Sequence, residues 1–225
     1  REQARGRRNP ILVGAIPFDM NQPVQLVVPE WHERVKPLDR SLSPFVDKDF
    51  IHHASEQSFA PNYVDFLDMI EQALSTFENS PLKKVVLSKI LKLTLDRSVD
   101  VPRLLANIMA QNPSAYHFSV PLNNSVLIGA SPELLIRKQG NKIFSNPLAG
   151  SAKRLINLDA DRQAAKTLSN SAKDQYEHRL VVDAIRAALL PVVESLKTQE
   201  EPSLISTPTM WHLSTDIEAT LPTVN

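Results

Sequence analysis

The stretch GASPELLIRKQGNKIFSN, residues 129–146, decides the fold class of this 225-residue chain. Two strand-like segments, Glu133–Lys138 and Lys142–Asn146, flank the turn-forming residues Gln139–Asn141. A short turn containing glycine between two such segments is typical of an antiparallel β-hairpin. Two more strand candidates, Tyr116–Pro121 and Ser125–Gly129, come just before it. The centre of the chain therefore predicts antiparallel sheet.

Helices are predicted on both sides of these strands. Asn62 is a good N-cap for a helix that ends near residues 79–81, and Asp100 caps a second helix that stops at Asn112. The first helix has one apolar face, which we expect to be buried, made of Phe66, Ile70, Ala73, Leu74 and Phe77. A third helical region, with room for one break, runs from about Asp159 to Leu196.

The remaining segments are extended or irregular. Short apolar pieces in residues 9–28 predict strands joined by turns, and residues 29–61 predict irregular structure. Val85–Leu95 is rich in branched apolar residues, which favours a strand buried on much of both faces. Hairpin connections outnumber long crossovers, so we expect an α+β protein. No repeat or linker divides the sequence, which predicts one domain over residues 1–225.

Composition excludes several classes of protein. The 25 Lys and Arg residues balance 25 Asp and Glu residues, so no overall charge would attract nucleic acid or an anionic membrane. No early apolar run is long enough to span a bilayer. The absence of cysteine excludes disulfides and thiolate metal sites and favours the cytoplasm.

Two acids in the last helical region are candidate metal ligands. Asp174 and Glu177 are three residues apart, so they share one side of a helix. The same stripe continues through apolar residues, namely Val181, Ala184, Ile185 and Ala188. Acids on an inward face need a partner, and Mg²⁺ prefers oxygen ligands. The alternative is a pair of solvated acids near a helix end. His178 points to another side, which favours a structural role.

Four other features are candidates for a site. Lys83 and Lys84 precede an apolar segment, and Glu133 follows small residues that leave space for a ligand. Gly150 and Ser151 follow a predicted strand, where backbone N–H groups can face an anion. His212 lies beside a tryptophan. Taken singly, each is equally compatible with an edge charge, a strand end, a turn or a packed pair, and the sequence pattern does not choose between Lys83 and Lys84.

Six motifs in order resemble the chorismate-utilising enzymes, a family that includes isochorismate, salicylate, anthranilate and aminodeoxychorismate synthases. The motifs are VGAIPFD (13–19), KVVLSK (84–89), GASPELL (129–135), PLAGSAKR (147–154), KDQYEH (173–178) and TPTMWH (207–212). The resemblance implies two packed, largely antiparallel sheets flanked by helices, with the active site between strands and a metal-bearing helix.

The resemblance also implies a role for each candidate residue. Lys84 would be the general base that activates water, and Glu133 the general acid for the departing hydroxyl group. Glu177, with Asp174 beside it, would hold Mg²⁺ against a carboxylate of chorismate. The residues that contact the substrate would be Gly150, Ser151 and His212.

Within the family, the motifs most resemble isochorismate synthases of siderophore (2,3-dihydroxybenzoate) synthesis. Ala149 stands where aminodeoxychorismate synthases carry a lysine, and anthranilate synthases lack the lysine that Lys84 supplies. Salicylate synthase is the alternative, because it shares the base and the acid. The VGAIPFD segment favours isochorismate.

The C-terminal motifs of the family do not occur before Asn225, and the chain begins with Arg1. We therefore expect an incomplete version of the fold that lacks a second metal-binding region. A non-catalytic fragment is the alternative from another class. Residues 1–225 alone should be inactive, and the complete protein should be a monomer.

Overall fold

The computed structural model describes residues 11–33 and 53–223, which form two compact units. One unit combines residues 11–33 with 100–131, and the other combines residues 53–99 with 132–223. Every candidate site residue belongs to the second unit. The expectation of a single domain stays a prediction.

The first unit consists of two antiparallel strand pairs and one helix. Strand β1 (Val13–Ala15) pairs with β2 (Gln25–Val27), and β5 (Tyr116–Leu122) pairs with β6 (Ser125–Ser131). Helix α2 (Val101–Gln111) packs against β5 and β6. The Asp100 side chain accepts a hydrogen bond from the Arg103 N–H at 3.0 Å, which confirms the predicted N-cap.

The second unit begins with a hairpin and a helix. Strand β3 (Ala54–Ala60) pairs with β4 (Ile90–Leu95), and α1 (Tyr63–Asn79) lies between them in sequence. Asn62 caps α1 as predicted, accepting a bond from the Asp65 N–H at 3.0 Å. The strand β3 was missed, because residues 54–60 (ASEQSFA) are mostly small or polar.

Two predictions of burial in this region were wrong. Strand β4 begins at Ile90 rather than Val85, and all but its last residue are exposed. Helix α1 has no buried residue, and Leu74 on its apolar face is 57% exposed. The reason is tertiary: β3 and β4 form a two-stranded sheet, and no other helix or strand of the described residues packs extensively against this sheet or against α1.

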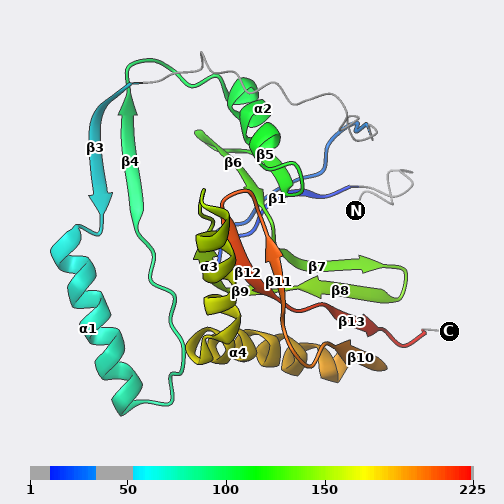
Figure 1. The fold of residues 1–225 in the computed structure, drawn as a ribbon. Helices are drawn as coiled ribbons and strands as arrows, with labels where there is room; N and C mark the ends of the chain where they lie inside the picture. The colour runs from blue at the N-terminus through cyan, green and yellow to red at the C-terminus, as the bar shows by residue number, and fades with distance from the viewer. Residues whose placement is uncertain (1–10, 34–52, 224–225) are drawn as a thin grey trace. The chain divides into compact units, whose positions relative to one another are not determined.

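Two larger antiparallel sheets follow. One has the strand order β10-β13-β8-β7 and the other β11-β12-β9. Their bounds are β7 Leu134–Gln139, β8 Lys142–Asn146, β9 Leu148–Lys153, β10 Ser195–Thr198, β11 Ser203–Ser206, β12 Met210–Ser214 and β13 Ile217–Thr220. The predicted hairpin is β7–β8, and β13 runs between β8 and β10 (Figure 1). The expected α+β fold with antiparallel sheets is therefore confirmed.

The predicted third helical region is two helices that meet at Ser171. Helix α3 (Leu158–Asn170) ends there, and the Ser171 hydroxyl accepts a bond from Asp174 N–H that starts α4 (Ala172–Leu189). A single 3-10 turn, Leu190–Val192, follows. The predicted end near Leu196 was wrong, because Pro191 cannot continue a helix and β10 begins at Ser195.

A small core joins α4 to the four-stranded sheet. Ile143, Ile217 and Ala219 from the sheet pack with Leu189 from the helix, and all four are at most 8% exposed. Val182 and Ile185 of α4 pack around them. This core fixes the helix that carries the two candidate metal ligands. In the described ranges, no helix combines the length and the apolar character that crossing a membrane requires.

Candidate active site

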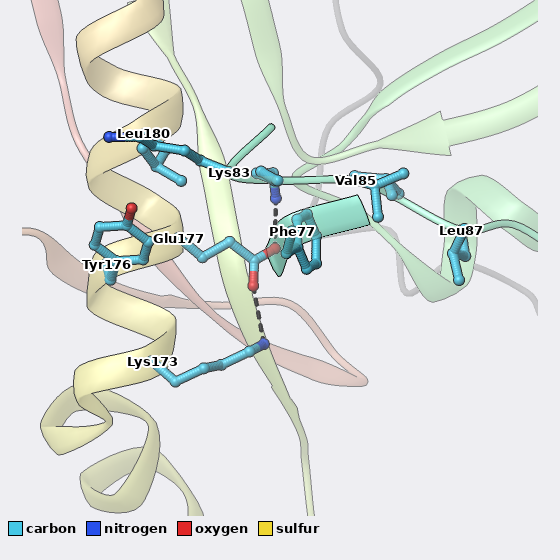
Figure 2. A pocket seen from close by; sticks show the side chains of 10 residues that line it. Phe77, Lys83, Val85, Leu87, Lys173, Tyr176, Glu177 and Leu180 are labelled. Atoms are coloured by element: carbon cyan, nitrogen blue, oxygen red, sulfur yellow. Dashed lines mark hydrogen bonds and ion pairs between the residues drawn. The ribbon is translucent and has the colours of Figure 1, made fainter. Parts of the chain in front are cut away.

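An ion pair joins two predicted site residues that lie 93 positions apart in sequence. The Lys84 ammonium group contacts Glu177 Oε1, and Lys173 Nζ contacts Glu177 Oε2 at 2.9 Å (Figure 2). Lys173 also lies 3.3 Å from Asp174 Oδ1. The neighbouring Lys83 is exposed, whereas the Lys84 side chain is only 25% exposed. The structure thus distinguishes the two lysines that the sequence pattern did not.

These contacts keep the Glu177 carboxylate ionised. The pKa of Glu177 is lowered, first by the hydrogen bond from Lys84 and then by the bond from Lys173, while burial opposes them. The pKa of Lys173 is raised, chiefly by the same bond to Glu177. The sequence analysis missed Lys173, although its spacing of four residues from Glu177 is the spacing of a helical ion pair.

The ion pair lies beside a cavity of about 430 Å³. Three lysines and one glutamate supply its charged groups, so its charge suits an anionic ligand. The lining residues are Phe77, Lys83, Lys84, Val85, Val86, Leu87, Lys173, Tyr176, Glu177 and Leu180. Figure 2 shows the Glu177 carboxylate between lysines from two different segments.

A second group of predicted residues lies on the sheet strands: Ser151 is inside β9, His212 is inside β12, and Glu133 directly precedes β7. The backbone N–H of Leu148 donates to Glu133 Oε1 at 3.0 Å, which holds Glu133 beside the start of β9. Ser151 Oγ and His212 Nδ1 are 2.8 Å apart across the β9–β12 pair. Burial lowers the pKa of His212, and the negative charge of Glu133 opposes that shift. Glu133, Ser151 and His212 are therefore neighbours.

Gly150 connects the two groups. Its φ of +83° lies in the left-handed region that favours glycine. A Cβ atom at this position would stand 3.1 Å from Asp174 Cβ and 3.1 Å from Leu213 Cδ1. The glycine therefore lets β9 approach α4 at Asp174, one turn before Glu177.

The predicted buried stripe of α4 was right for Val181, which is half-buried, and for Ile185, which packs on the core, and wrong for the two alanines. Ala184 and Ala188 are exposed, and the covered side runs instead through His178, Val182, Ile185 and Leu189. Asp174 and Glu177 lie at the edge of that side, with side chains 23% and 28% exposed. The residues of α4 that pack against the sheet therefore lie mostly one position after those expected.

His178 is structural, as predicted, and its two bonds explain why. Its ring is 1% exposed, with Nδ1 3.0 Å from the Ala149 carbonyl oxygen and Nε2 2.8 Å from Thr215 Oγ1. Burial lowers the pKa of His178, while the bond to Ala149 opposes the shift. Its neutral ring links α4 to β9 and to the turn after β12.

A buried cluster beside the site was not predicted. Asp161 is 3% exposed and accepts bonds from Arg154 Nε at 2.9 and 3.0 Å, the Leu155 N–H at 2.9 Å and Trp211 Nε1 at 3.0 Å. The Leu155 N–H is the largest cause of the lowered pKa of Asp161. The cluster fixes Trp211, the residue before His212. Apart from an acid near a helix start, nothing in the amino-acid sequence indicates this contact.

Asp174 and Glu177 fit a magnesium site only as part of its ligand set. Across residues 11–33 and 53–223, no group of three or more His, Asp or Glu side chains could enclose a metal ion. Mg²⁺ is commonly bound through one or two carboxylates, with water and substrate oxygens completing the octahedron. The Glu177 carboxylate in the wall of an anion-accepting cavity, with Asp174 three residues before it on the same helix, matches that arrangement.

The fold and the site define an α+β protein with a lysine-rich cavity between the carboxylate-bearing helix α4, the extended segment 83–87 that precedes β4, and Phe77 of α1. The family described as "Chorismate binding enzyme" matches residues 4–225. The chain belongs to that family.

The chain is similar to two isochorismate synthases over most of its length. The chain is 39% identical over 218 residues to isochorismate synthase EntC of Escherichia coli K12, covering 96% of this chain and 56% of the relative. It is 37% identical over 231 residues to isochorismate synthase DhbC of Bacillus subtilis, again covering 56% of that protein. The chain therefore spans a little over half the length of these relatives.

A solved structure supports the fold. The crystal structure of DhbC from Bacillus anthracis matches all of this chain with a TM-score of 0.87 and 35% sequence identity. The match covers 58% of that structure. The expected family fold is confirmed over the length of this chain.

Proposed function

We propose that this chain forms part of an isochorismate synthase that isomerises chorismate with Mg²⁺, for the synthesis of a 2,3-dihydroxybenzoate siderophore. The observation that carries the proposal is the contact between Lys84 and Glu177. The residues assigned as base and as metal ligand come from distant parts of the sequence and meet beside one cavity. The names of the relatives favour isochorismate over salicylate as the product.

The reaction removes the hydroxyl group from one ring carbon and adds a hydroxyl group from water to another. Water adds to carbon 2 of chorismate and loses a proton, while the hydroxyl group on carbon 4 takes up a proton and leaves as water. Atoms therefore balance, and the double bonds of the ring shift. One group must accept a proton and another must donate one, on opposite sides of the ring.

Lys84 is the proposed base and Glu133 the proposed acid. Lys84 needs a free electron pair to accept a proton, and in the present arrangement its ammonium group is bound to Glu177. A Mg²⁺ ion held by Glu177 would supply the positive charge that Lys84 now supplies to this carboxylate. With Mg²⁺ as the partner of Glu177, Lys84 would release one proton to solvent, and its neutral amine could then accept a proton from the attacking water.

Glu133 is held for its role by the backbone N–H of Leu148, which donates to one carboxyl oxygen. The other oxygen is the one assigned to carry the proton for the leaving hydroxyl group. Gly150, Ser151 and His212 are assigned to contact the substrate, and the Ser151–His212 bond fixes both side chains across two strands.

Asp174 and Glu177 are the residues proposed to hold Mg²⁺, with other ligands from water and substrate. The ion would neutralise a substrate carboxylate and so position the ring. Lys173, which contacts both acids, is the second cation that Mg²⁺ would displace, besides Lys84. We expect the complete protein to act as a cytoplasmic monomer.

The test is product analysis with the complete protein. Chorismate and Mg²⁺ are incubated with the protein, and the products are separated by chromatography. Isochorismate supports the proposal, salicylate assigns the protein to the sister activity, and unchanged chorismate contradicts both. Lys83→Ala is the matched control for Lys84→Ala, because Lys83 lines the same cavity without contacting Glu177 in the ion pair described.

A further inference from the structure

His178 is the one side chain of α4 seen to bond directly to both strand segments that carry the proposed substrate contacts. Ala149, which accepts from Nδ1, immediately precedes Gly150 and Ser151. Thr215, which bonds Nε2, follows β12 three residues after His212. His178 itself follows Glu177 in the helix.

The strand pairing is irregular at this point. His212 pairs with Ser151, but the next pair is Ser214 with Leu148, so the register shifts between them. Regular ladder bonds fix a strand pair residue by residue, and they are interrupted at a bulge. The backbone around Ala149 and Gly150 therefore depends on contacts from outside the ladder.

The ring of His178 provides such a contact in one defined tautomer. A carbonyl oxygen only accepts, so Nδ1 carries the proton and donates to Ala149. Nε2 of the neutral ring then accepts from the Thr215 hydroxyl group. Both His178 and Thr215 are at most 2% exposed, so neither bond can be replaced easily by water.

We propose that His178 is a positioning residue that holds the Gly150–Ser151 segment and the end of β12 in place relative to the carboxylates of α4. The inference rests on the proposed function, which assigns Gly150, Ser151 and His212 to the substrate. It adds a role for a residue that contacts none of the reacting groups. The competing explanation is that His178 only fills space in the core.

Thr215→Val separates the two explanations, because valine keeps the volume of threonine and removes the hydroxyl group. Thr215→Ser restores the hydroxyl group. Ser145→Ala is the matched control, since it removes another buried hydroxyl group. That group donates to the Leu135 carbonyl oxygen at 2.7 Å, and its strand β8 pairs with β7 and β13 rather than with β9. His178→Asn tests the same link from the helix, because its shorter amide can donate to Ala149 without reaching Thr215.

The first measurement is steady-state kinetics of the complete protein with chorismate. Thr215→Val and His178→Asn should raise KM about tenfold, the factor that corresponds to one lost bond of about 1.4 kcal/mol. Thr215→Ser and Ser145→Ala should keep the KM of the parent. A space-filling role would lower the amount of active protein and leave KM unchanged in all four variants.

The second measurement is hydrogen exchange of the peptide that contains β9, which requires no activity. Exchange should be faster in Thr215→Val than in Ser145→Ala. If the parent makes no isochorismate, the proposed function fails, and the exchange result alone decides the positioning role. Unchanged exchange in Thr215→Val, or a KM increase equal to that of Ser145→Ala, would overturn the inference.

Discussion

Gly150→Ala should damage both the stability and the activity of the protein, whereas Gly140→Ala should affect stability alone. Both glycines have positive φ, +83° at Gly150 and +60° at Gly140. A Cβ atom at Gly140 would have nothing within 4 Å, so that substitution changes only the backbone energy. A Cβ atom at Gly150 would crowd Asp174 and Leu213 at 3.1 Å.

The expected magnitudes follow from these contacts. A non-glycine residue in the left-handed region costs about 1–2 kcal/mol, and this is the whole cost expected at Gly140. Carbon atoms pack best at about 3.5–4.0 Å, so the new methyl group at position 150 must push β9 away from α4. Overpacking of this kind costs about 1–3 kcal/mol. Gly150→Ala should therefore lose about 2–5 kcal/mol in free energy of unfolding.

The assay is urea unfolding of the complete protein, with the parent and both variants measured at equal concentration. Turnover of chorismate is measured on the same preparations. Gly140→Ala should keep parental kcat and KM, because it lies in the β7–β8 turn away from the cavity residues. Equal unfolding free energies for the two variants, with parental turnover in Gly150→Ala, would refute the role assigned to the β9–α4 contact.

Three further predictions concern charged groups. Lys84→Ala and Glu133→Gln should each lower turnover by about 10² to 10⁴, the usual loss for a positioned base or acid; a change of only a few-fold removes that residue from the mechanism. Glu177→Gln should raise the Mg²⁺ concentration needed for half-maximal activity far more than His178→Gln does, and equal shifts in a Mg²⁺ titration would contradict the assignment of the metal ligand. The pKa of Asp161 is lower in the folded protein than in the unfolded chain, where it is about 3.9, so the ionised carboxylate stabilises the fold above that pH. This stabilisation is lost as the pH falls through the folded pKa. The gap in urea midpoint between parent and Asp161→Asn should therefore narrow between pH 5 and pH 2, and a constant gap would show that ionisation of this group does not stabilise the fold.

Local features of the fold were predictable because their causes lie within a few residues. Asn62 and Asp100 cap the helices they were expected to cap, and the β7–β8 hairpin forms around the predicted turn. The four strands after α4 were missed because each has only four or five residues. A segment that short carries little periodicity, and its sheet partners lie far away in sequence.

The pairing of Lys84 with Glu177 could not be derived from local pattern. The two residues are 93 positions apart, and each taken alone is compatible with a solvated surface charge. Only the order of several motifs in a known family indicated that they belong together. The cluster around Asp161 shows the same limit, because nothing in the sequence links that acid to Trp211, 50 positions later.

The position of Asp174 and Glu177 at the edge of the covered side of α4, rather than on it, has a consequence for the chemistry. Had Asp174 and Glu177 occupied the core side of the helix, both charges would have required partners against a large desolvation cost. The core side is instead taken by His178, Val182, Ile185 and Leu189, which anchor the helix to the sheets. The two acids lie at the edge of that side and are partly exposed, and Glu177 lines the cavity. A carboxylate in that position can exchange a lysine for a metal ion without unpacking the core, which is what the proposed reaction requires of Glu177.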